Sequence, residues 1–189
     1  MSRFEIDYPY NYPRIYQTEP NTCVPTTIKI VLEMMRHKID GIPDLSVDQV
    51  AKIVGTQEDG TPQGHNIERI NEHLKLTNPS LEFKLEFLIP KWQIICDDIN
   101  EMNPFRKPVI LLIMQFDSHE LNWFQHAVVL IEANNEYVTY FDPIYGDMTE
   151  PTNKVYHQWE MNDRLCIRLK IGERVQRILE EFQGSEEVT

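Results

Sequence analysis

Three side chains that could act together as a nucleophile and its base stand far apart in the chain: Cys23, His126 and Asp142. A thiolate is a strong nucleophile, and a histidine can take the thiol proton and later return it to a leaving group. A carboxylate can hold the histidine ring in the required orientation and tautomer. Singly, each residue has a commoner interpretation: an inert buried thiol, a histidine at a strand end, and a turn residue before proline. Their combination in this order indicates attack on a carbonyl carbon.

Cys23 stands where a polar, proline-containing loop runs into the apolar segment 25–38. The segment predicts a buried helix, and Pro25 fits its first turn, where no backbone donor is needed. The unpaired N–H groups and partial positive charge of a helix N-terminus favour an anion, so a thiol there should ionise readily. Gln17, six residues before Cys23, could turn its side-chain amide toward the same point and donate to a developing oxyanion.

His126 and Asp142 lie on two consecutive predicted strands, 126–131 and 136–142, joined at Asn134-Asn135. Opposed residues of an antiparallel pair have position numbers with a constant sum. A three-residue loop, 133–135, gives a sum of 268 and sets His126 directly opposite Asp142, with Cβ atoms about 5 Å apart. A two-residue turn gives 269 and sets the two on opposite faces unless a bulge intervenes. The sequence allows both registers.

The remaining pattern predicts helices in the first half of the chain and antiparallel strands in the second, which is an α+β arrangement. A capping-box pattern at Ser46 opens a short helix. We expect an extended arm over residues 1–16 that lies across the body. Further predicted elements are a helix over 66–76, a strand over 81–87, a helix from Pro90 that contains Cys96, a strand over 109–116, a polar loop over 117–124, a strand over 164–170 and a helix over 171–183.

These elements predict one domain over residues 1–184, followed by a flexible tail over 185–189. The helical lobe is expected over about 17–103 and the β-sheet lobe over about 104–170, with a cleft between the two. The loop 56–64 could border a substrate or could be only a connection.

Composition excludes several classes of function. A net charge of −12 argues against nucleic acid and against an anionic membrane surface as partners. The longest apolar run, 109–114, is too short to span a bilayer. Three cysteines without CxxC spacing predict neither a disulfide framework nor a zinc site, and His119 with His126 lacks further ligands, so we expect no metal and no cofactor. The N-terminus has no apolar signal segment, which favours a reducing cytoplasm. No feature indicates an oligomeric state.

The motifs resemble those of the papain-like cysteine peptidases. Gln17 ahead of Cys23 at a helix start, then His126-Ala-Val-Val, then Asp142-Pro143, follow the order and spacing of that superfamily. The sequence is most similar to the bacteriocin-processing, double-glycine-leader peptidases and their stand-alone relatives, over about residues 8–170. The further features in agreement are Lys107-Pro108-Val109-Ile110, the Gly60-Thr61 loop before a helix, and Trp159 after the Asp turn.

The resemblance implies a papain-like fold, with the Cys helix packed against an antiparallel sheet, and a thiol hydrolase that cleaves peptide or isopeptide bonds through a thioester acyl-enzyme. It assigns Cys23 as nucleophile, His126 as general base and Asp142 as the residue that orients the histidine. It assigns Gln17, with the backbone N–H of Cys23, to the oxyanion hole. The implied partner is a peptide or protein substrate. Val24 departs from the pattern, which has Gly after the Cys, so the substrate preference need not transfer.

Two alternatives stay open. Transglutaminases and arylamine acetyltransferases also use Cys, His and Asp in this order, so the chain could be an acyltransferase. It could also be a binding protein that keeps the fold while Cys23 is buried and unreactive.

Overall fold

The computed structural model describes residues 12–36, 39–62, 65–77, 83–100 and 107–172. The helices are α1 (Cys23–Arg36), α2 (Val47–Val54), α3 (His65–Thr77), α4 (Trp92–Asn100) and α5 (Thr152–Glu160). The strands are β1 (Phe83–Leu88), β2 (Val109–Asp117), β3 (Asn122–Ala133), β4 (Tyr137–Asp142), β5 (Gly146–Pro151) and β6 (Cys166–Ile171). The chain is α+β, as its sequence predicts. Most of the predicted helix over 171–183, and the tail over 185–189, lie outside the described residues.

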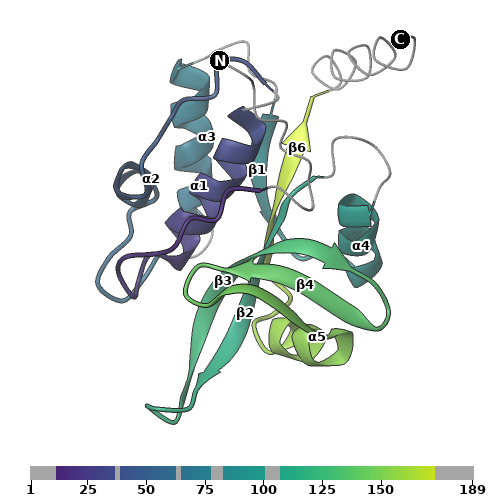
Figure 1. Ribbon diagram of the computed structural model, residues 1–189. Coiled ribbons are helices and arrows are strands. Elements are labelled where there is room, and N and C mark those ends of the chain that lie inside the picture. Colours follow the sequence, from purple (N-terminus) through teal and green to yellow (C-terminus); the bar gives the residue numbers. More distant parts are fainter. Residues whose placement is uncertain (1–11, 37–38, 63–64, 78–82, 101–106, 173–189) are drawn as a thin grey trace, which may run out of the picture.

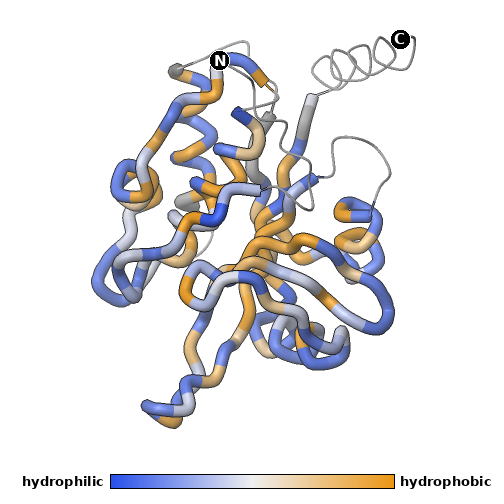
Figure 2. Tube along the Cα trace, viewed as in Figure 1, coloured by the Kyte–Doolittle hydropathy of each residue, from blue (hydrophilic) through white to orange (hydrophobic). Residues whose placement is uncertain are grey.

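The strands within these ranges form one antiparallel sheet in the order β1-β6-β2-β3-β4-β5. Helices α1, α2 and α3 cover one face of this sheet, and α4 and α5 cover the other (Figure 1). The sheet therefore carries a hydrophobic core on each side. In Figure 2 the hydrophobic colour is concentrated along the central strands, between the two groups of helices.

Alternation along β3 separates the two cores. Ala127 and Val129 belong to the core under α1, α2 and α3, whereas Val128 and Leu130 belong to the core that contains Trp159. Strand β3 is buried on both faces from His126 to Ile131, because helices cover each face. Full burial of each large aliphatic side chain there stabilises the fold by about 1.5–3 kcal/mol.

Helix α1 is enclosed on nearly every side, as its apolar sequence predicts. Six of its large aliphatic side chains are at most 2% exposed: Ile28, Ile30, Val31, Leu32, Met34 and Met35. The helix begins at Cys23, two residues before the predicted start. The predicted capping box of α2 is confirmed: the Ser46 hydroxyl accepts from the Gln49 N–H at 3.2 Å, and the Gln49 side chain accepts from the Ser46 N–H at 2.8 Å.

The structure corrects the predicted division into lobes. Strand β1 lies within the segment assigned to the helical lobe, yet it pairs with β6 at the edge of the sheet. Helix α4, also from that segment, packs on the face opposite α1. Long-range pairing therefore takes elements of the first half of the chain into the β-sheet lobe. Two elements, β5 and α5, were not predicted. Strand β5 is short, and its sequence has no regular spacing of apolar residues.

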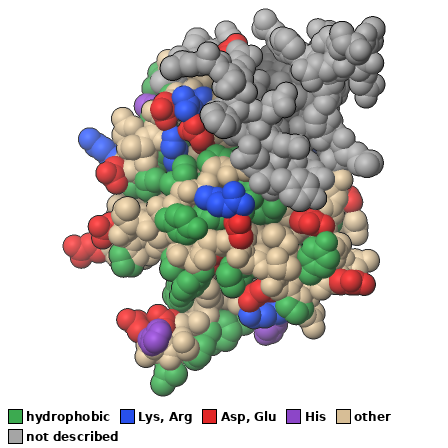
Figure 3. Space-filling view, viewed as in Figure 1, with side chains coloured by type: hydrophobic (Ala, Val, Ile, Leu, Met, Phe, Trp, Pro, Cys, Tyr) green, Lys and Arg blue, Asp and Glu red, His purple; other side chains and the backbone are tan. Residues whose placement is uncertain are grey.

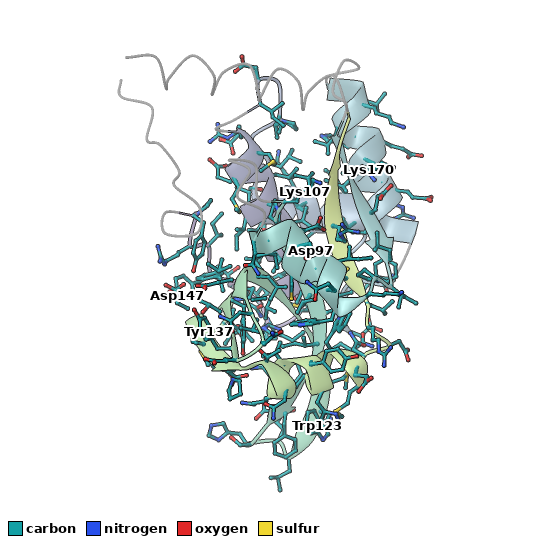
Figure 4. The ribbon with its side chains drawn as sticks, turned by 90° about the vertical axis from the view of Figure 1, so that its right-hand side faces the viewer. Asp97, Lys107, Trp123, Tyr137, Asp147 and Lys170 are labelled. Atoms are coloured by element: carbon teal, nitrogen blue, oxygen red, sulfur yellow. The ribbon has the colours of Figure 1, made fainter. Side chains whose placement is uncertain are left out.

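Half of the predicted polar loop over 117–124 is strand. Strand β2 continues to Asp117 and β3 starts at Asn122, which leaves a turn of four residues between them. The resulting hairpin projects from the body at the lower left of Figure 1, and its aromatic pair Phe116 and Trp123 is 45% and 43% exposed. Figure 3 shows hydrophobic atoms at this tip, and Figure 4 places Trp123 near its end, far from Lys170.

None of the helices within the described ranges is sufficiently long and apolar to cross a membrane.

Candidate active site

The first turn of α1 holds the thiol of Cys23 against strand β3. The side chain is partly buried. Burial alone would raise the pKa of the thiol. A hydrogen bond with His126 and its charge, with hydrogen bonds from the backbone N–H groups of Ala127 and Val24, outweigh burial and lower that pKa below its ordinary value. The thiol is therefore set in a place that favours its anion, as its predicted position at a helix start requires.

His126 provides the opposite charge. Its side chain is 1% exposed, and its Nε2 lies 3.0 Å from Oδ1 of Asp142. Burial by itself lowers the pKa of an imidazole, but the hydrogen bonds with Asp142 and Cys23 raise the pKa of His126 to about 9. The two directions of shift, down for Cys23 and up for His126, each favour the charged form of the group.

Asp142 is fully buried and uses one oxygen for two tasks. Oδ1 accepts from the backbone N–H groups of Ile144 at 2.7 Å and Tyr145 at 3.2 Å, and it also meets His126. Burial works to raise the pKa of this carboxyl, yet the bond with His126 and these N–H groups lower it. The residue therefore caps a turn and orients the imidazole at once. Its other oxygen, Oδ2, is buried without a partner in the part of the chain that the structure describes.

A β-bulge brings His126 and Asp142 to the same face of the sheet. Near the turn, Ala133 pairs with Val138, a sum of 271, which would set His126 and Asp142 on opposite faces. Beyond a register shift between Leu130 and Glu132 the sum is 270: the pairs are Leu130 with Tyr140 and Val129 with Phe141. Direct opposition, one of the two registers that the sequence allows, therefore does not occur. The two residues are diagonal neighbours on one face, which long side chains can bridge.

The side-chain amide of Gln17 is bonded within its own loop in this structure. Its Nε2 donates to the carbonyl oxygens of Glu19 at 3.0 Å and Pro20 at 3.2 Å, within its own loop. Its backbone N–H donates to the carbonyl of Pro143 at 3.0 Å, which ties this loop to the turn after Asp142. The Gln17 side chain is not among those that line the cleft beside Cys23.

The arm before this loop, residues 12–16, lies across the body, as predicted for the described part of it. Tyr12 is buried in the core under α1, α2 and α3, and its hydroxyl donates to Asp147 on β5. Arg14 donates to the same carboxylate at 3.0 Å, and the Tyr16 ring meets Phe141 edge-on at 5.4 Å. Figure 4 shows Asp147 on the side of the molecule where this arm passes.

A cleft of about 380 Å³ opens beside Cys23 and His126. It lies between the loop that precedes Cys23, the loop from Glu58 to Pro62, and the sheet. The loop over 56–64, which the sequence left as either a substrate border or a connection, therefore borders the cleft. Asn21 holds that loop by donating to the carbonyl of Gln57 at 2.5 Å. The walls carry mainly apolar side chains: Val24, Pro62, Ile67, Phe87, Leu112, Phe124 and Ile167. Two carboxylates, Glu58 and Asp59, also line the cleft.

Asn162, which also lines the cleft, was not among the predicted site residues. It lies in the turn between α5 and β6, far from the Cys and His motifs in sequence, and no local pattern singles out an asparagine in a turn. The other two cysteines are buried apart from the cleft, and burial raises the pKa of Cys96 and raises that of Cys166 to about 12. His119 and His157 are exposed. Within the described ranges, no group of three or more His, Cys, Asp or Glu could hold a metal ion.

Sequence comparison identifies the relatives of this chain. The model of the Peptidase_C39 like family matches residues 9–167. No curated protein sequence matches the chain significantly. The match spans Gln17, Cys23, His126 and Asp142, and it confirms the resemblance indicated by their motifs.

Solved structures with the same fold support this assignment. The peptidase domain of Streptococcus ComA, a bifunctional ABC transporter of a quorum-sensing pathway, superposes with a TM-score of 0.58 at 16% identity, over 85% of this chain and 99% of that one. A C39-like peptidase from Bacillus anthracis gives 0.59 at 16%, over 86% and 96%. A double-glycine-motif protease from an AMS/PCAT transporter, in complex with the leader peptide, gives 0.52 at 19%, over 85% and 92%. At these identities the likeness concerns the fold, which is papain-like and α+β as predicted.

Proposed function

Because the chain belongs to the Peptidase_C39 like family, we propose that it is a cysteine peptidase with Cys23 as nucleophile, His126 as general base and acid, and Asp142 as the residue that orients His126. One observation carries the proposal: the buried pair His126 and Asp142, with Nε2 and Oδ1 3.0 Å apart, lies beside the partly buried Cys23, and His126 lowers the pKa of the thiol while Asp142 and Cys23 raise that of the imidazole. An inert structural cysteine would have a raised pKa, as Cys96 and Cys166 do.

The proposed reaction has two halves. The Cys23 thiolate attacks the carbonyl carbon of a peptide bond, and the carbonyl electrons move to oxygen to form a tetrahedral oxyanion. His126 gives its proton to the amine as the C–N bond breaks, which leaves a thioester on Cys23. His126 then takes a proton from water, the hydroxide attacks the thioester, and the thiolate leaves as the carboxylic acid product forms. Asp142 keeps the imidazole oriented and stabilises its charged form throughout.

The oxyanion would lie at the start of α1, where the backbone N–H of Cys23 is available at a helix N-terminus. We propose that Gln17 supplies the second donor after its amide turns away from the carbonyls of Glu19 and Pro20, which it binds in the free protein. This change exchanges two neutral hydrogen bonds within the loop for one to an anion, which is a stronger bond.

The proposed substrate is a peptide or protein chain that lies in the cleft. The apolar walls beside Cys23 suit side chains of an extended segment. The protease of similar fold that was solved with a leader peptide supports this choice of ligand class. We propose the cytoplasm as the compartment, because catalysis requires a reduced Cys23 and all three cysteines are free thiols.

The proposal is tested by the rate of iodoacetamide alkylation at Cys23, followed by peptide mass spectrometry from pH 4 to pH 9. We expect fast labelling of the wild type at pH 5–6 and loss of that labelling in His126→Ala and His126→Gln, which differ in the cavity they leave. Cys96 and Cys166 are internal controls, since both are buried with raised pKa values. Labelling of Cys23 that begins only near the ordinary thiol pKa, about 8.5, and that ignores His126 would overturn the proposal.

A further inference from the structure

The β2–β3 hairpin extends one wall of the cleft outward from the body. Leu112 on β2 and Gln125 on β3 line the cleft. In the register of the two strands Gln125 is opposite Met114, and the next pair on that face is Phe116 with Trp123. Opposed residues share a face and side chains alternate with a period of two. The aromatic pair therefore lies on the cleft face of the hairpin, two residues or about 7 Å of strand beyond Gln125.

The aromatic pair, Phe116 and Trp123, is an exposed apolar surface. The two side chains are 45% and 43% exposed, although their rings pack together with centroids 5.3 Å apart. Leu121, in the turn beside them, is 77% exposed. Large apolar side chains that gather on a projecting element and continue a cleft indicate a binding surface. The hairpin and the loop between α2 and α3 lie on the same side of the molecule, at the left of Figure 1.

That second loop places two carboxylates, Glu58 and Asp59, at another border of the cleft. They are the central residues of a tight turn, which is closed by the N–H of Gln57 on the carbonyl of Gly60 at 2.8 Å and by the reverse bond at 3.0 Å. Asn21 also donates to the Gln57 carbonyl, so the turn is tied to the loop that precedes α1. The position of both carboxylates at the cleft is therefore fixed by the backbone.

The charges along the cleft and the hairpin are nearly all negative. Among the described residues that line the cleft there is no Lys or Arg, and His126 is the one group that becomes positive when protonated. The segment 109–133 contains no Lys or Arg either, and it carries Asp117 and Glu120 at the tip of the hairpin. Backbone N–H groups of the tip lower the pKa of Asp117, which therefore stays ionised. This distribution of charge attracts a basic ligand and repels an acidic one.

Aromatic rings beside carboxylates suit one kind of side chain. Lys and Arg carry a cation on an apolar stem: the stem packs on a ring, and the ring face attracts the cation by about 0.5–1 kcal/mol at exposed sites. An apolar segment would use the rings but gain nothing from the carboxylates, and an acidic segment would be repelled. A polypeptide segment with basic residues among apolar ones matches both features.

We propose that the cleft binds a basic polypeptide segment, and that Phe116 and Trp123 hold a Lys or Arg side chain of this segment outside the cleft. The inference rests on the proposed peptidase function and adds the class of substrate to it. Trp123 precedes Ala127, whose N–H bonds the Cys23 thiol, by four residues. An extended segment beside β3 covers that length with about four residues of its own, so the basic residue lies about four positions from the bond that is cleaved.

The test measures how well peptide pools protect Cys23 of the wild type from iodoacetamide. Each pool contains capped dodecapeptides in which alternate positions are lysine, N-acetyl-lysine or glutamate, and the others are random alanine, serine, leucine and phenylalanine. We expect the lysine pool to halve the alkylation rate at a concentration about tenfold lower than the acetyl-lysine pool, and the glutamate pool to protect least. Salt at about 0.5 M should remove most of this advantage. Equal protection by the lysine and acetyl-lysine pools would overturn the inference.

A double variant, Phe116→Ser with Trp123→Ser, tests the aromatic pair. Each protection is divided by the rate of the same variant without peptide. We expect the advantage of lysine over acetyl-lysine to fall about 3- to 10-fold, because the ring faces are lost. Ile94→Ala is the matched control, since Ile94 is 40% exposed on α4, which covers the other face of the sheet. An unchanged advantage in the double variant contradicts the proposal, and so does a wild-type dimer that the double variant abolishes, because a second copy then covers the rings.

Glu58→Gln with Asp59→Asn tests the carboxylates of the turn. The amides keep the shape of both side chains and remove their charges, so we expect the advantage of the lysine pool and its dependence on salt to fall together. Glu136→Gln is the control, because Glu136 is exposed in the turn that follows the far end of β3. Equal losses in the turn variant and in this control would mean that overall charge, and not the cleft, selects the basic peptide.

Alkylation without peptide separates this inference from the proposed function. If iodoacetamide finds no His126-dependent thiolate in the wild type, the proposed function fails. If the thiolate is present but the lysine pool protects it no better than the acetyl-lysine pool, the function stands and the inference fails.

Discussion

Oδ1 of Asp142 lies 3.0 Å from Nε2 of His126 and is the only atom through which the carboxylate and the imidazole are joined. Both side chains are 1% exposed, so water screens their interaction little. The charge of Asp142 therefore helps to set the pKa of His126, and His126 in turn affects how readily Cys23 ionises.

Asp142→Asn should move the pH dependence of Cys23 alkylation toward higher pH. The amide keeps the shape of the side chain but removes the negative charge, so the pKa of His126 falls and that of Cys23 rises. A shift of at least about one pH unit in the midpoint of iodoacetamide labelling is expected. Asp147→Asn is the control. Asp147 lies on the neighbouring strand, and its carboxylate accepts hydrogen bonds from Tyr12 and Arg14. If the two variants shift the midpoint equally, Asp142 does not tune the pair.

His126 should stabilise the fold at neutral pH and lose that effect in alkali. Its folded pKa, about 9, exceeds the ordinary value of 6.5, so the contribution is complete below pH 6.5 and is lost as the pH rises through 9. The raised pKa corresponds to at most about 3 kcal/mol. Urea unfolding at pH 6 and pH 10 should show that the stability difference between wild type and His126→Gln shrinks at pH 10. His119→Gln, in the exposed hairpin turn, is the control, and its stability should differ little from that of wild type.

Gln17→Ala should separate acylation from alkylation. Reaction of Cys23 with p-nitrophenyl acetate passes through an oxyanion, whereas displacement of iodide from iodoacetamide does not. We expect the acylation rate to fall about 10- to 1000-fold and the alkylation rate to remain within about twofold, since no oxyanion donor is needed there. If both rates fall together, Gln17 acts only by holding the loop through Glu19 and Pro20.

Gly146→Ala should destabilise the protein more than Gly60→Ala. Both glycines have positive φ, 86° and 112°, so alanine is strained at each. At Gly146 the added Cβ would also lie 3.0 Å from the Tyr16 hydroxyl, whereas at Gly60 nothing lies within 4 Å. The expected excess is about 1 kcal/mol of unfolding free energy, measured by urea denaturation. Equal losses would mean that the Tyr16 side chain yields without cost.

Prediction from sequence was accurate where the controlling contacts are local. The helix that begins at Cys23, the capping box at Ser46 and the buried strand over 109–116 were all predicted within two residues of their observed positions. Caps, apolar periods and turn residues act within a few positions of one another, so a single sequence reveals them. The segments from β5 through α5 were missed because their side chains are largely polar and lack a clear period.

The candidate site is less readily predicted, because its geometry depends on contacts between distant segments. Sequence motifs named Cys23, His126 and Asp142, and the structure brings these three together. The same motifs placed the Gln17 amide at the thiol, but in the structure its own loop holds it. Asn162 carried no motif at all, and only packing of the α5–β6 turn beside Gln125 brings it to the cleft.

By itself the sequence determined the α+β class, the residues of the candidate cluster and their order, and the helix start that favours a thiolate. These depend on residue type and on spacing along the chain. Only the tertiary structure decided that His126 and Asp142 share a face. Next to the hairpin turn the paired position numbers add up to 271, an odd sum that would set the two residues on opposite faces. The bulge between Leu130 and Glu132 changes the sum to 270 and returns them to one face. Side chains alternate with a period of two, so one extra unpaired residue exchanges the faces, and the packing of β3 between two cores selects where that residue lies.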